Sequence, residues 1–129
     1  MKISVKGFAL VEVVVVIVLL SGSLLVFLEA LSQAKSLQIK SEIKTTQSLL
    51  LHLKINELRS VNYEDIVQNN SYTNFPTYPN YSYSYNFSYL DENLAIVSSA
   101  TSMKRIDLNI KHNDNAFPII SESFIISNL

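Results

Sequence analysis

The feature that most constrains this chain is an apolar run of 21 residues, Phe8–Leu28, whose only charged residue is Glu12. A helix rises about 1.5 Å per residue, so this run would span about 30 Å, the thickness of a bilayer hydrocarbon core. Lys2 and Lys6 precede the run, and charges of both signs follow it. The positive-inside rule therefore predicts a single-pass membrane protein with a cytoplasmic amino terminus and with residues 31–129 on the other side of the membrane.

A cleaved secretory signal peptide is the alternative interpretation, with Ser32-Gln33-Ala34 as its small-residue cleavage site. Signal peptides usually carry an apolar stretch of about 7–15 residues, which is shorter than this run. An acid inside a membrane also costs about 2.5–3.5 kcal/mol. A carboxylate that is kept at this cost indicates a functional residue, so we expect Glu12 to have a partner.

The segment around Glu12 resembles a known signature. Residues Lys6-Gly7-Phe8-Ala9-Leu10-Val11-Glu12, followed by Val13–Leu20, are similar to the prepilin-type amino-terminal signature of type IV pilins and type II secretion pseudopilins. The resemblance implies that a prepilin peptidase cuts between Gly7 and Phe8 and then methylates the new amino terminus on Phe8. It also implies that Glu12 pairs with the amino-terminal ammonium of a neighbouring subunit during filament assembly.

The resemblance divides the chain into three parts. Residues 1–7 would be the prepilin leader, residues 8–30 the transmembrane and assembly helix, and residues 31–129 an extracytoplasmic pilin-like domain. From Phe8 to Ser60 the sequence contains no proline and only one glycine, Gly22, so a helix is expected to continue to about Arg59. Its second half carries an apolar stripe that something must cover. The stripe is expected to contain Ile39, Ile43, Leu50 and Leu53, widened by Leu51, Ile55 and Leu58.

The remaining residues alternate in a way that predicts an antiparallel sheet. Residues 61–80 are expected to form a loop, because Asn, Ser, Thr and two prolines are frequent in its second half. Strict alternation from Tyr81 to Tyr89 places five aromatic side chains on one face of a strand. Three further strands are predicted at Leu94–Ser98, Lys104–Lys111 and Phe117–Ile126, which gives a four-stranded meander. The predicted fold class is α+β, a pilin-like long amino-terminal helix packed on a small sheet.

Several residues are candidates for binding sites. The five aromatic side chains could stack on a ligand, but we expect them to cover the helix, which leaves Tyr72 and Tyr78 as the better adhesive candidates. We interpret the basic pair Lys104-Arg105 as a solvated strand start, so nucleic-acid binding is not indicated. Neither Asp91-Glu92 nor the two histidines, His52 and His112, have the neighbours that a metal site needs.

Composition argues against most enzyme classes. The chain has no cysteine, two glycines and two histidines. Thiol chemistry is therefore excluded, and glycine-rich phosphate loops cannot form after Gly22. We expect no catalytic residues, no metal and no cofactor.

The sequence thus predicts a structural minor pilin or pseudopilin, assembled through its amino-terminal helix into a type IV pilus or a type II secretion-type filament. The expected partners are prepilin peptidase, other pilin or pseudopilin subunits, the inner-membrane assembly platform and membrane lipid. The alternative function is a monomeric, single-pass membrane-anchored binding or adhesion module.

Overall fold

The computed structural model describes residues 5–128, with side chains from Ala9 onward. The chain forms two compact units, Met1–Lys40 and Ser41–Leu129. Helix α1, Val5–Ser60, supplies the whole described part of the first unit and the first element of the second. In the second unit it is followed by a short 3-10 helix η1, Tyr63–Asp65, and by five strands. These strands are β1 Asn69–Asn74, β2 Tyr81–Leu90, β3 Ile96–Val97, β4 Met103–His112 and β5 Ile120–Ser127.

Helix α1 extends over nearly the range expected from the absence of proline. Its last turn is closed by the Ser60 hydroxyl, which donates a hydrogen bond of 2.7 Å to the carbonyl oxygen of Glu57. Arg59 in the same turn places a positive charge at the negative end of the helix dipole. After Ser60 the chain leaves the helical conformation and reaches η1 within two residues.

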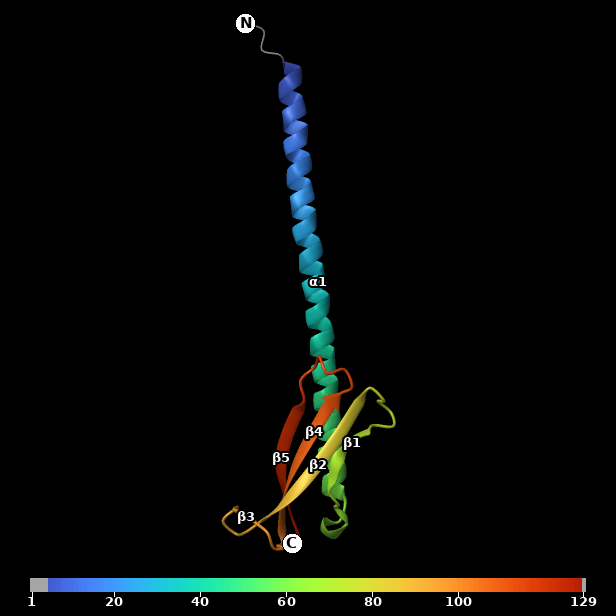
Figure 1. Cartoon of the computed structure of the whole chain (residues 1–129), viewed down its shortest axis with the longest axis vertical. Helices are drawn as coiled ribbons and strands as arrows, with labels where there is room; N and C mark the ends of the chain where they lie inside the picture. Colours follow the sequence, from blue (N-terminus) through green and yellow to red (C-terminus); the bar gives the residue numbers. More distant parts are fainter. Residues whose placement is uncertain (1–4, 129) are drawn as a thin grey trace. The chain divides into compact units, whose positions relative to one another are not determined.

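The strands of the second unit form one antiparallel sheet with the order β1-β2-β4-β5 (Figure 1). Strands β2 and β4 pair along their full length, from Tyr81 opposite His112 to Leu90 opposite Met103. Strand β5 pairs with β4 without interruption, from Ile120 opposite Ile110 to Ser127 opposite Met103. The α+β class and the antiparallel sheet that the sequence predicted are therefore confirmed.

The sheet differs from the predicted four-stranded meander in two ways. Residues 69–74, expected within a loop, form β1 and pair with β2. The strand expected at Leu94–Ser98 is only the two-residue β3, which pairs with β2 instead of linking β2 to β4 in the sheet order. Strand β1 was missed because its sequence, NNSYTN, has exposed polar side chains and none of the apolar alternation that predicts a strand.

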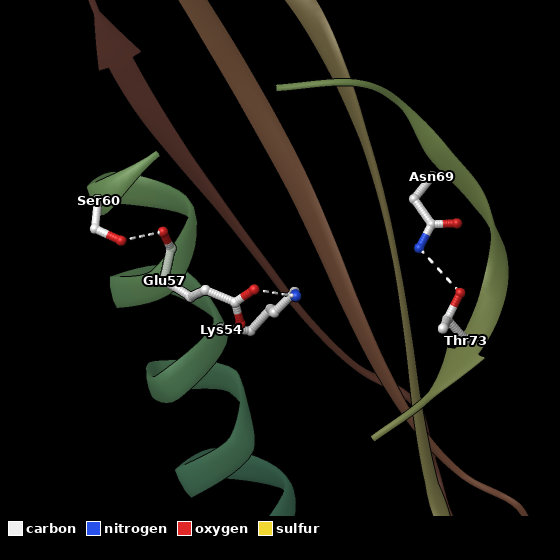
Figure 2. A network of polar contacts seen from close by, with 5 residues as sticks. All are labelled: Lys54, Glu57, Ser60, Asn69 and Thr73. Carbon is white, nitrogen blue, oxygen red and sulfur yellow. Dashed lines mark hydrogen bonds and ion pairs between the residues drawn. The ribbon is translucent and has the colours of Figure 1, made fainter. Parts of the chain in front are cut away.

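Strand β1 is not paired regularly with β2, and a side-chain hydrogen bond crosses the irregular part. Its pairing with β2 shifts register between Asn69 and Thr73. The Asn69 side-chain amide donates a hydrogen bond of 3.2 Å to the Thr73 hydroxyl across this shift (Figure 2). An interrupted, polar outer strand of this kind is a poor template for further strand addition.

The core of the second unit lies between α1 and one face of the sheet. The three central side chains of β4, Ile106, Leu108 and Ile110, are fully buried. From the helix they are met by Leu50, Leu51, Ile55 and Leu58, all at most 5% exposed. The predicted stripe was wrong for Leu53, which is 52% exposed, and for Ile39, which is 44% exposed. Leu53 lies about 200° around the helix from Leu51, at 100° per residue, so the two cannot face the same sheet.

Two neighbouring leucines test this packing on one helix. Leu50 is 1% exposed and Leu49 is 49% exposed. We expect Leu50→Ala to lower the free energy of unfolding of the sheet unit by about 2–5 kcal/mol, through lost burial and a cavity. Leu49→Ala should change it by about 0.5 kcal/mol or less. All seven tyrosines lie between Tyr63 and Tyr89 and the chain has no tryptophan, so tyrosine near-UV circular dichroism of the full chain in detergent follows this unit alone.

Equal destabilisation by the two variants would show that the buried face of the helix has been assigned incorrectly.

Candidate functional site

The apolar part of α1 is fully exposed in its own unit. The described helix has one stretch that is long and apolar enough to cross a membrane, with a mean hydropathy of 2.8 in its best window and none of that window buried. Leu19 and Leu25, for example, are 67% and 69% exposed. Such a helix requires an apolar environment that its own unit does not supply.

Glu12 differs from the other polar side chains of this stretch. The Ser21 hydroxyl donates to the carbonyl oxygen of Ile17 at 2.7 Å, and the Ser23 hydroxyl donates to that of Leu20 at 2.9 Å. Both serines are thus satisfied within the helix, as a hydrocarbon environment requires. Within residues 9–128 the Glu12 carboxylate has neither a hydrogen bond nor an ion pair. Among the polar side chains between Ala9 and Leu28, it alone has no hydrogen bond or ion pair to a residue that the structure describes.

The predicted cleavage position lies outside the described side chains. The backbone of Gly7 and Phe8 belongs to α1. Because their side chains are not described, the assignment of Gly7 and Phe8 to cleavage, and of Phe8 to methylation, remains a prediction.

The aromatic face of β2 packs inward, as the alternation predicted. Tyr81, Tyr83, Tyr85 and Phe87 are half-buried and pack against the core. They lie beside the buried β4 residues, since Tyr83 pairs with Ile110, Tyr85 with Leu108 and Phe87 with Ile106. The rings therefore contribute to the core. The two adhesive candidates, Tyr72 and Tyr78, are exposed, at 44% and 36%.

Two lysines lie among these aromatic rings. The Lys54 ammonium sits 4.1 Å from the centre of the Tyr83 ring. It also pairs with a carboxylate oxygen of Glu57 at 2.8 Å (Figure 2). Burial alone would lower the pKa of Lys54, but the Glu57 hydrogen bond, together with Tyr83, outweighs burial and holds this pKa above its usual value.

Lys104 corrects the interpretation of the basic pair. It is 4% exposed, and its ammonium donates a hydrogen bond of 2.7 Å to the carbonyl oxygen of Tyr63. The rings of Tyr63 and Phe87 lie 4.2 and 4.6 Å from it. Arg105 points to the opposite face of the sheet, where it pairs with Asp107 at 3.2 Å. Lys104-Arg105 therefore forms neither a solvated strand start nor a basic patch. Lys104 lies two and four residues before Ile106 and Leu108, so it shares their face of the strand, and this was the sequence signal for its burial.

The remaining candidates have structural roles. One carboxylate oxygen of Asp91 accepts hydrogen bonds from the backbone N–H groups of Asn93 and Ala95, at 2.9 and 2.8 Å. His112 packs edge-on against the rings of Tyr81 and Phe117, each at 5.0 Å. No cluster of three or more potential metal ligands occurs among the residues that the structure describes.

Comparison of this chain with protein-family models, with curated proteins and with solved structures found no match.

Lys104 makes stability depend on pH. Burial lowers its pKa below the usual 10.5, and the charge of Glu64 opposes this only in part. Where pH lies between the lowered folded-state value and 10.5, the unfolded chain binds more protons, so stability rises with pH. Relative to Lys104→Met, which removes the titrating group, the wild-type chain should gain stability as pH rises through this window. Unfolding followed by tyrosine circular dichroism at a series of pH values measures the difference.

The control is Lys44→Met, which removes a positive charge from an exposed position on α1. A gap between wild type and Lys104→Met that is constant with pH would mean that Lys104 is not charged at a cost in the folded unit.

Proposed function

We propose that this chain is a structural subunit of a type IV pilus or a type II secretion-type filament, a minor pilin or pseudopilin. It would be made as a single-pass protein of the inner membrane, with a cytoplasmic amino terminus and the sheet unit on the periplasmic or extracellular side. Prepilin peptidase would cut after Gly7 and methylate Phe8. The inner-membrane assembly platform would then move the subunit into a filament of similar subunits.

The observation that carries this proposal is the isolation of Glu12 in an apolar, exposed helix. Its flanking residues Val11 and Val13 are 61% and 58% exposed. The nearest basic residues in the sequence are Lys6 on one side and Lys35 on the other. Cleavage after Gly7 removes Lys6 and creates an ammonium on Phe8, four residues from Glu12 or about 6 Å along the helix axis. A buried carboxylate and a buried ammonium are tolerated as a pair where either alone is expensive.

Pairing of the Phe8 ammonium with the Glu12 carboxylate of a staggered neighbouring subunit supports an assembly role better than pairing of the two groups within one helix. If the Phe8 ammonium of one subunit meets the Glu12 carboxylate of the next, both charges are paired in an apolar filament core. The axial offset between subunits is then fixed, because any other register leaves both charges unpaired at a cost of several kcal/mol. The same carboxylate would thus select for processed subunits and set their register.

A filament role also agrees with what the sheet unit offers. Lys54, Lys104, His112 and the turn at Asp91 take part in packing and hydrogen bonds, and no cluster of potential metal ligands occurs among the described residues. We therefore propose that the chain is not an enzyme. A monomeric anchored adhesion module would leave Glu12 without a partner.

The first test concerns processing. Intact mass spectrometry of the membrane-extracted chain should show a mature protein that begins with N-methyl-Phe8. Gly7→Leu should leave the precursor uncut, because a bulky side chain obstructs the peptidase, whereas Ala9→Thr should be cut normally. A chain that retains Met1, or one that begins at Lys35 after signal-peptide cleavage, would contradict the proposal.

The second test concerns Glu12. Glu12→Gln keeps the shape of the side chain but removes its charge, so membrane insertion and cleavage should be normal. Recovery in sheared, purified filaments should fall about 100-fold, which corresponds to the roughly 3 kcal/mol at the lower end of the cost of breaking a buried pair. Quantitative immunoblotting of membrane and filament fractions measures both.

Glu29→Gln is the matched control, since Glu29 is an exposed carboxylate of the same helix that accepts a hydrogen bond of 3.5 Å from the side-chain amide of Gln33. Filaments that contain Glu12→Gln at the wild-type level would disprove the assembly role of Glu12.

A further inference from the structure

A small apolar groove lies in the sheet unit between α1 and the loop that joins β1 to β2. Its walls include Leu50 and Leu53 from the helix and Phe75, Pro76 and Tyr78 from the loop, and its volume is about 180 Å³. A cavity of roughly 150 Å³ is enough to hold benzene, so this groove can hold one aliphatic or aromatic side chain. Lys54 and Glu57 also line it, but they neutralise each other at 2.8 Å. The groove therefore favours an uncharged, apolar occupant.

An exposed apolar tip follows the other end of β2. It consists of Leu94-Ala95-Ile96, with Leu94 58% exposed and Ile96 60% exposed. The turn that carries it is held firmly: Asp91 accepts the N–H groups of Asn93 and Ala95, and Leu94 donates its own N–H to the carbonyl oxygen of Asp91 at 3.0 Å. The leucine side chain is thus presented to solvent by an ordered turn.

Leu94 occupies a backbone conformation that does not suit it. Its φ is 62°, and within the described range it is the one non-glycine residue with a positive φ. The left-handed region costs a leucine about 1–2 kcal/mol, which glycine or asparagine would largely avoid. Because the side chain is exposed, contacts within its own unit do not explain why leucine stands here. A leucine in the left-handed region that does not stabilise its own unit indicates that its side chain has a role in binding.

We propose that the Leu94 side chain of one copy inserts into the groove of a second copy. The groove loop precedes Tyr81 and the tip follows Leu90, so the two features are separated by the length of β2, about 30 Å at 3.3 Å per residue. Contact between two different surface regions is heterologous, and each copy then offers one groove and one Leu94 to its neighbours. This inference rests on the proposed filament function, and it names a contact between globular units whose head-to-tail direction matches a polar assembly.

Cysteine cross-linking of the full-length chain tests the contact directly, because the natural sequence has no cysteine. Two differently tagged versions, one with Leu94→Cys and one with Thr77→Cys at the groove, are expressed together, and their membranes are oxidised. We expect a disulfide between the two tags. The control replaces Thr77→Cys with Leu49→Cys, which is exposed on α1 but does not line the groove. Equal yields from the two pairs, or a dominant Leu94→Cys homodimer, would overturn the proposal.

Variants of Leu94 separate binding from folding. Leu94→Asn suits the left-handed backbone, so its sheet unit should unfold at or above the wild-type temperature, while self-association of the full chain in detergent weakens at least tenfold in sedimentation equilibrium. Leu94→Met, which keeps an apolar side chain, should retain association. Wild-type association of Leu94→Asn would show that the leucine side chain has no binding role. A lower unfolding temperature for Leu94→Asn would show that leucine stabilises its own unit, which removes the argument for binding.

The outcome for the filament remains distinct. If the chain is processed at Gly7 and enters filaments but gives no cross-link between positions 94 and 77, this inference fails and the proposed function stands. If the chain is neither processed nor incorporated, the proposed function fails, whatever the cross-linking shows.

Discussion

The sheet unit depends on one requirement: the apolar stripe in the second half of α1 must be covered. Leu50, Leu51, Ile55 and Leu58 cannot face water without losing most of the burial energy that this small unit has available. Polar groups on the same side of the helix are tolerated because each has a partner. Gln47, 1% exposed, donates a hydrogen bond of 3.1 Å to the carbonyl oxygen of Pro118, and Lys54 pairs with Glu57 over the Tyr83 ring. The position of the sheet on the helix is therefore specified by polar contacts as well as by apolar area.

The same helix meets two different environments. From Phe8 to Leu28 every residue except Glu12, Ser21, Ser23 and Gly22 has an apolar side chain, which suits lipid or a filament core. From Ile43 onward only one side of the helix is apolar, which suits a sheet. The hydroxyls of Ser21 and Ser23 donate hydrogen bonds to carbonyl oxygens of the same helix, whereas the Glu12 carboxylate has no hydrogen bond or ion pair within residues 9–128. The proposed assembly mechanism follows from this difference between two kinds of polar residue in one apolar segment.

Much of the fold could be predicted from periodicity. The alternation of Tyr81–Tyr89 and of Lys104–Lys111 predicted β2 and β4 and the correct inward faces. Strand β1 could not be predicted this way, since its side chains are polar and exposed and its place is fixed by backbone pairing with β2. The sequence did not predict the burial of Lys104, because a lysine is usually solvated even where it shares a strand face with Ile106 and Leu108. Only the structure shows the aromatic rings and the Tyr63 carbonyl oxygen that accommodate its ammonium. The groove and the left-handed Leu94 arise from loop geometry, which the pattern of residue types does not encode.

The central place of β4 in the sheet has a consequence for synthesis. The helix stripe is made first, but the buried sheet side chains that cover it come from β4 and from Phe124 in β5, and the Gln47–Pro118 hydrogen bond joins residues 71 positions apart. Such distant contacts close slowly because the intervening chain must lose its freedom before they form. A ribosome therefore exposes the apolar stripe for as long as it takes to make the next sixty or so residues, about 3–12 s at roughly 5–20 residues per second. During that interval the apolar stripe of the nascent chain has no sheet to cover it.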